Sequence, residues 1–188
     1  MTVFEFVVSL YVVIAGLGVT LLVRSIGQML EARRRIAFYW VHTSWLAFIF
    51  LLHVNSWFTL WDYRDLTSWT VGQFLLLLSV PTLLYLVSHV AVPEIGEGAD
   101  RHDMRRYYYE RHRLILGLLA ISVVFTLANE YHLAGRDMLT TATGVRLGGL
   151  GLLLAGIASH RPAVHAGIVF GALAIIAWAL GYVGHAIG

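Results

Sequence analysis

An arginine inside an apolar segment is the residue best placed to do chemistry in this chain of 188 residues. Arg146 lies about nine residues into a hydrophobic stretch, roughly 13 Å down a helix axis, which is too deep for easy contact with water. Glu130 ends the preceding hydrophobic stretch and is the natural partner across a short connection. The two residues predict either a structural ion pair between helices or a site that handles an anion or a proton.

Further polar side chains fall at the same expected depth as this pair. Each is expensive to bury in lipid, so their coincidence at one depth predicts an outward-facing polar cavity. The leading functional hypothesis is a pathway or binding site for an ion, a proton or a small solute, as in a channel or transporter. Separate hydrogen bonds between helices are the alternative for each residue alone. The expected site comprises His53, Asn55, Trp57, Gln73, Asn129, Glu130, Arg146, Tyr182 and His185.

Two members of this set have the spacing His-x-x-x-Trp, at His53 and Trp57. This spacing resembles the gate motif of the small viral proton channels, where a histidine takes up protons and an indole one turn away occludes the pore. A histidine with an unperturbed pKa of about 6.5 exchanges protons near neutral pH. The resemblance implies that His53 titrates and that Trp57 occludes; a role as an interfacial anchor is the alternative for Trp57.

Paired histidines suggest a second chemistry, because a b-type haem needs one imidazole on each side of its iron. His42 and His89 fall at comparable depth on neighbouring predicted helices, and His53 and His185 form a second candidate pair. Two haems could then be held across the bilayer. The alternative function is a haem-binding electron-transfer protein, a membrane haem oxidoreductase if it is an enzyme. A non-catalytic membrane scaffold or sensor is a further alternative.

Several other chemistries are excluded or not indicated by the sequence. The chain has no cysteine, so it forms no disulfide, thiolate metal site or cysteine nucleophile. It has no lysine either, which excludes lysine Schiff-base chemistry. The sequence shows no nucleophile elbow, zinc-protease helix or glycosidase acid pair. We therefore expect no metal and no cofactor, with haem b as the alternative, and a protein that is not an enzyme.

The elements that position these residues are hydrophobic helices. The chain is 59% hydrophobic and only 13% charged, which is typical of an integral membrane protein. Six apolar stretches, each about long enough to cross a bilayer, predict an all-α bundle of six transmembrane helices in a single domain over residues 1–188. The polar residues 93–113 are expected to form a cytoplasmic loop. The helices are expected at about residues 2–23, 36–60, 67–92, 114–131, 138–159 and 162–186.

The arginines indicate the orientation of the bundle. Arg24, the three residues Arg33 to Arg35, five arginines of the central loop and Arg161 make ten of the 13 arginines, all on one side of the predicted membrane. Positive residues collect on the cytoplasmic side, so we expect both termini on the outer side of a bacterial inner membrane. The loop arginines and tyrosines suit anionic lipid head groups, and we expect no nucleic-acid partner.

The last two predicted helices differ from the others in being rich in small residues. Gly144, Gly148 and Gly151 precede Gly167 and Gly171 at four-residue or nearby spacing. Such surfaces let helix backbones approach closely. They predict tight packing within the fold or against a second copy of the chain in a homo-oligomer.

Overall fold

Six long helices make up the computed structural model, which describes residues 3–66, 68–95, 101–137 and 139–187, with side chains up to residue 181. All six are long and apolar enough to cross a membrane. The predicted all-α protein with six membrane-spanning helices is therefore confirmed. The helices are α1 (Val3–Glu31), α2 (Trp40–Thr59), α3 (Val71–Ala91), α4 (Met104–His132), α5 (Thr141–Ala158) and α6 (Pro162–Ile187).

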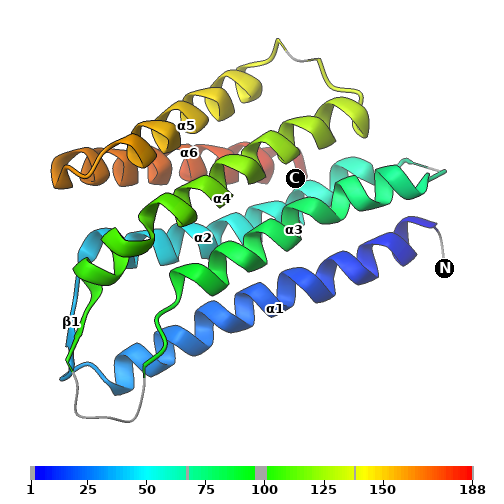
Figure 1. Cartoon of the computed structure of the whole chain (residues 1–188). Coiled ribbons are helices and arrows are strands. Elements are labelled where there is room, and N and C mark those ends of the chain that lie inside the picture. Colours follow the sequence, from blue (N-terminus) through cyan, green and yellow to red (C-terminus); the bar gives the residue numbers. More distant parts are fainter. Residues whose placement is uncertain (1–2, 67, 96–100, 138, 188) are drawn as a thin grey trace.

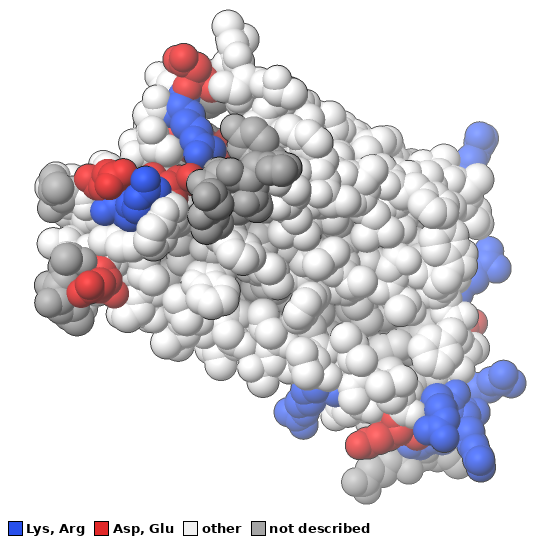
Figure 2. Space-filling view, turned by 180° about the vertical axis from the view of Figure 1, so that it is seen from behind, with Lys and Arg blue, Asp and Glu red and all other residues white. Residues whose placement is uncertain are grey.

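Successive helices run in alternating directions, so α1 begins and α6 ends toward the same end of the bundle (Figure 1). Helix α4 packs against α3 and α5, and α5 packs against α6. Helix α2 contacts α1, α3, α4 and α6, which gives it an interior place in the bundle. Charged side chains gather at the two ends, and an uncharged belt lies between them (Figure 2). We name the ends after Asp62 and Arg33.

The start of α4 corrects the prediction of a cytoplasmic loop over residues 93–113. The helix begins at Met104, and the residues from there to 113 belong to it. Met104, Tyr108 and His112 are buried at four-residue spacing, which places them on one helix face. The Asp103 carboxylate caps this helix by accepting hydrogen bonds from the backbone N–H groups of residues 105 and 106, at 2.8 and 3.2 Å. The many arginines of this segment led to the prediction of a loop, although the segment forms the first turns of an amphipathic helix.

Two short strands also lie outside the prediction. Strand β1 (Ile36–Ala37) pairs in parallel with β2 (His102–Asp103), in the register Ile36 to His102 and Ala37 to Asp103. Strands of two residues are too short to leave a periodic pattern in a sequence. Their pairing ties the connection between α1 and α2 to the beginning of α4.

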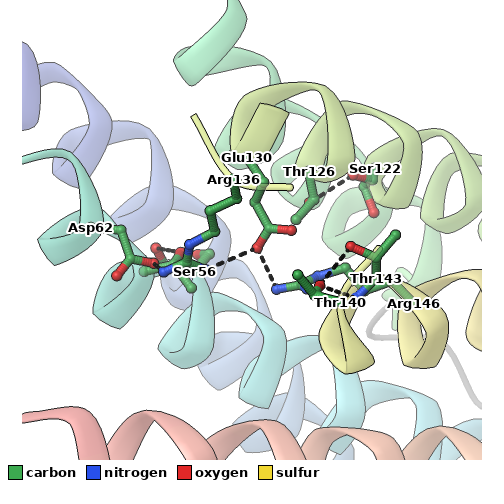
Figure 3. Close-up of polar contacts among 10 residues, drawn as sticks. Ser56, Asp62, Ser122, Thr126, Glu130, Arg136, Thr140, Thr143 and Arg146 are labelled. Carbon is green, nitrogen blue, oxygen red and sulfur yellow. Dashed lines mark hydrogen bonds and ion pairs between the residues drawn. The ribbon is translucent and has the colours of Figure 1, made fainter. Parts of the chain in front are cut away.

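The remaining helix bounds lie close to the expected ones, with two differences. Helix α1 continues to Glu31, beyond the expected end near residue 23. Helix α2 begins at Trp40 and is followed by a short 3-10 helix, η1 (Leu60–Tyr63). This extra turn carries Asp62 toward the connection between α4 and α5, where the charged residues discussed below meet (Figure 3).

Candidate intramembrane binding site

Glu130 of α4 and Arg146 of α5 form the ion pair that the sequence predicts. The Nη2 atom of Arg146 lies 2.6 Å from the Oε1 atom of Glu130. Glu130 is 8% exposed, so its carboxylate is removed from water. A buried ion of this kind is tolerated only when it is paired and hydrogen-bonded.

The pair belongs to a larger charged network, drawn in Figure 3. Arg136 lies 3.5 Å from the Oε1 atom of Glu130 through Nη1, and 2.8 Å from the Oδ2 atom of Asp62 through Nη2. Gly135, with a φ of 60°, adopts the left-handed conformation that glycine favours, just after α4 ends. The turn lets the backbone N–H of Arg136 donate to the Glu130 carbonyl oxygen at 3.0 Å. The network therefore alternates in charge from Asp62 through Arg136 and Glu130 to Arg146.

Asp62 and Arg136 are the network members that sequence reasoning missed. Both fall in short polar connections, where a charged residue is ordinarily solvated. A glycine just past the end of a predicted helix was the available signal, because it marks a turn that brings the next residues back onto that helix. That signal points Arg136 toward Glu130, but it carries no information about Asp62 on a different helix.

A cavity of about 160 Å³ lies beside this network, between the helices. Side chains from all six helices line it. Its lining on α4 runs from Leu119 in the middle of the helix to Asn129 near the Asp62 end. The walls toward mid-helix are apolar and include Leu84, Leu119, Leu153, Ile168 and Ala172, whereas the Asp62 end carries Asn55, Ser56, Thr126, Asn129 and Arg146.

Three polar atoms of the lining residues are buried without a hydrogen-bond partner in the part of the chain that the structure describes. They are the Oδ1 atoms of Asn55 and Asn129 and the Nη1 atom of Arg146. Asn129 is only 2% exposed. The nearby hydroxyl groups of Ser122 and Thr126 do have partners, because both donate to carbonyl oxygens of their own helix, at 2.7 and 2.9 Å. One donor and two acceptors, all on residues that line the cavity, thus lack a described protein partner.

Three other predicted site residues lie elsewhere, outside the described lining of the cavity. The Nε2 atom of His53 lies 3.0 Å from the Oγ atom of Ser88, and the ring packs so closely on Gly18 that a Cβ there would overlap it. The side chain of Gln73 belongs to the cap of α3, accepting from the Thr70 backbone N–H at 2.9 Å. Trp57 is 61% exposed on the surface of the bundle. His53 and Trp57 therefore lie outside the lining of the cavity described above, and the gate-like role of their spacing stays a prediction.

The histidines proposed as haem ligands lie in different surroundings where they are described. His42 is fully buried, and its Nε2 atom donates to the carbonyl oxygen of Ala91 at 2.9 Å. His89 is exposed on the surface of α3. His185, like Tyr182, lies outside the residues whose side chains are described. Haem binding stays a prediction, and within the described ranges no three His, Asp or Glu residues are placed to hold a metal ion.

A second buried polar group, which we call the Tyr108 chain, lies toward the Arg33 end. The indole Nε1 of Trp45 donates to the Tyr108 hydroxyl at 3.0 Å, and that hydroxyl lies 2.8 Å from Nδ1 of His165. The Nε2 atom of His165 lies 2.9 Å from the Ser159 carbonyl oxygen, which only accepts. His165 therefore carries its proton on Nε2, and Tyr108 donates to Nδ1. Each hydrogen-bonding atom of the three side chains is used.

No family model, curated protein or solved structure matches this chain.

Proposed function

We propose that the protein binds a small solute in the cavity between its helices, within the membrane. One observation carries this proposal: a cavity walled by all six helices is lined by Arg146 and Asn129, each of which has a buried polar atom without a protein partner among the described residues. Buried polar groups are nearly always hydrogen-bonded. Arg146 pairs with Glu130 through Nη2, so its Nη1 atom is left for a partner beside the cavity that the residue lines.

The size of the cavity limits the solute. Its volume of about 160 Å³ is close to that of a cavity of ~150 Å³ that accommodates benzene in another protein, and is well below the ~300 Å³ at which drug-sized pockets begin. A single ring or a short branched chain is therefore the largest body that fits without rearrangement of the helices.

Binding of a solute is favoured here over conduction of an ion. An ion crossing the bundle would need polar partners along its whole route, since an uncompensated charge in an apolar interior costs several kcal/mol. The described lining has its polar side chains at the Asp62 end, and the mid-helix walls are leucine, isoleucine and alanine. Of the functions predicted from the sequence, we therefore retain the binding site for a small solute, which a carrier or a sensor would share.

The arginine distribution supports an orientation for this site. Ten of the 13 arginines fall on the side predicted to be cytoplasmic, so the Asp62 end would face outward. The polar end of the cavity would then lie toward the outer surface of a bacterial inner membrane. Contact with anionic lipid at the Arg33 end and assembly into a homo-oligomer stay predictions.

Photolabelling in proteoliposomes tests the proposal. A small alkyl diazirine, activated by light, should form adducts with residues that line the cavity, which mass spectrometry identifies. Ala172→Phe fills the apolar half and should abolish those adducts. The matched control is Gly148→Phe on the exposed face of α5, where nothing lies within 4 Å of an added Cβ. Labelling confined to lipid-facing residues in the wild-type protein would contradict the proposal.

A further inference from the structure

The polar end of the cavity offers a donor and an acceptor from two different helices. Arg146 of α5 and Asn129 of α4 both line it, and the Nη1 atom of Arg146 and the Oδ1 atom of Asn129 are buried without a described protein partner. A guanidinium only donates, and an amide oxygen only accepts. A ligand group that only accepts, such as an ether or ketone oxygen, would leave the Asn129 oxygen unpaired. A group that both accepts and donates would satisfy the two residues together.

The charged network beside the cavity is already balanced. Asp62 and Glu130 contribute two negative charges, and Arg136 and Arg146 contribute two positive charges. A carboxylate bound at Nη1 of Arg146 would add an unbalanced negative charge close to Glu130, whose Oε1 atom lies 2.6 Å from Nη2 of the same guanidinium. An ammonium group would instead be repelled by Arg146. Since unbalanced charge is costly in an apolar interior, an uncharged ligand is favoured.

Asn55 of α2 adds a second acceptor to the same end of the cavity. Its Oδ1 atom is also buried and without a hydrogen-bond partner in the described ranges. The available set is then one cationic donor and two neutral acceptors. The charge of Arg146 is already balanced by Glu130, and the two amide oxygens are neutral, so these atoms do not favour a negatively charged ligand.

We infer that the solute is an uncharged molecule with a compact apolar body and a single polar group that both donates and accepts hydrogen bonds, of which a hydroxyl is the smallest example. The inference rests on the proposed function, because it names the ligand class of the same cavity. The apolar body packs against the walls that include Leu119, Leu153 and Ile168. The hydroxyl accepts a hydrogen bond from Arg146 and donates one to Asn129.

Competition against the diazirine label separates this inference from the proposed function. Four probes share a benzene-sized body: toluene has no polar group, anisole only accepts, phenol accepts and donates, and benzoate is an anion. Each is compared at equal concentration in the liposome membrane after its partitioning is measured. Because a hydrogen bond to a charged group changes affinity by roughly tenfold or more, phenol should protect the cavity at about one tenth of the toluene concentration, and anisole, which leaves the Asn129 oxygen unpaired, should fall between them. Benzoate should compete more weakly than phenol.

Variants locate the effect on the two residues. Arg146→Met removes the donor and should reduce the advantage of phenol over toluene to what the Asn129 acceptor alone provides, while competition by toluene is unchanged. Asn129→Leu removes the acceptor without changing the charge, so it gives an independent answer if Arg146→Met does not fold. The matched control is Arg136→Gln, which alters the same network away from the described cavity lining and should leave the preference for phenol intact.

The outcomes are distinguishable. Equal competition by phenol, anisole and toluene would mean that water satisfies the polar atoms, and it would overturn the inference while leaving a solute-binding cavity. Stronger competition by benzoate than by phenol would overturn the inference in favour of an anion site. Failure of every probe to protect the cavity residues would instead contradict the proposed function itself.

Discussion

The Tyr108 chain and the Arg146 site are both made of buried polar side chains from neighbouring helices, yet they differ in how completely those side chains are paired. In the Tyr108 chain, Trp45, Tyr108 and His165 use every hydrogen-bonding atom on one another or on the Ser159 carbonyl oxygen. At the other end of the bundle, Arg146 pairs one nitrogen with Glu130, and another is buried without a described partner. Complete pairing is typical of a structural group, and incomplete pairing beside a cavity favours a ligand.

His53 shows that residue type alone does not decide between these two cases. An intramembrane histidine is a functional candidate by default, but the ring of His53 contacts Gly18 and Ser88 and does not face the described cavity. Asparagine is a less conspicuous residue, yet Asn55 and Asn129 both line the cavity. The following substitutions test whether stability and ligand binding separate in the way that this contrast requires.

The largest expected effect is that of Glu130→Gln. It leaves the half-buried Arg146 without its anion, and breaking such a pair should reduce the free energy of unfolding by about 3–5 kcal/mol. Reversible unfolding in mixed micelles measures the change. Adding Arg146→Met to the same chain should recover part of the loss, because no uncompensated charge remains. A loss below about 1 kcal/mol for the single variant would class the pair with exposed ion pairs instead.

Tyr108→Phe should have the next largest effect. The substitution removes one hydroxyl and leaves the Trp45 N–H and the His165 Nδ1 unpaired, which should cost about 1–3 kcal/mol of stability. Competition by phenol at the cavity should not change. Tyr109→Phe is the matched control, since its half-buried hydroxyl has one described partner, Tyr39, at 3.2 Å. If Tyr108→Phe weakened phenol competition, the two regions would be coupled and the contrast would fail.

Gly18→Ala tests the packing of His53. The added methyl group overlaps the imidazole ring, which a hydrogen bond to Ser88 holds, so we expect a loss of about 1–3 kcal/mol from overpacking. Gly148→Ala, with open space around its added Cβ, should be neutral or slightly stabilising in the same unfolding measurement. Equal stability of the two variants would show that His53 can move aside, as a titrating gate would require.

The smallest expected effect is that of Arg136→Gln. The side chain of Arg136 is 41% exposed, and exposed ion pairs contribute only about 0.2–1 kcal/mol. Unfolding in mixed micelles should therefore change little, and raising the salt concentration should change the wild-type protein equally little. A loss as large as that of Glu130→Gln would show that Arg136, rather than Arg146, is the principal partner of Glu130.

Local features of the sequence determined the helices and one contact of the site. Six apolar stretches predict six membrane-spanning helices because an isolated helix satisfies its own backbone hydrogen bonds in lipid, so length and hydropathy suffice. The pairing of Glu130 with Arg146 was equally accessible, since a short connection between two antiparallel helices brings their adjoining ends together. The early start of α4 was accessible too, through Met104, Tyr108 and His112 at four-residue spacing.

Only the tertiary structure decided which polar side chains share the cavity. Asn55, Asn129 and Arg146 come from three different helices, and their meeting depends on how far each helix is rotated about its axis. In a soluble protein, the apolar stripe of a helix reveals that rotation. In a bilayer the surface that faces lipid is as apolar as the surface that faces the core, so this signal is lost. The uniform apolarity that makes the helices easy to predict therefore gives no indication of which faces of the helices contact one another.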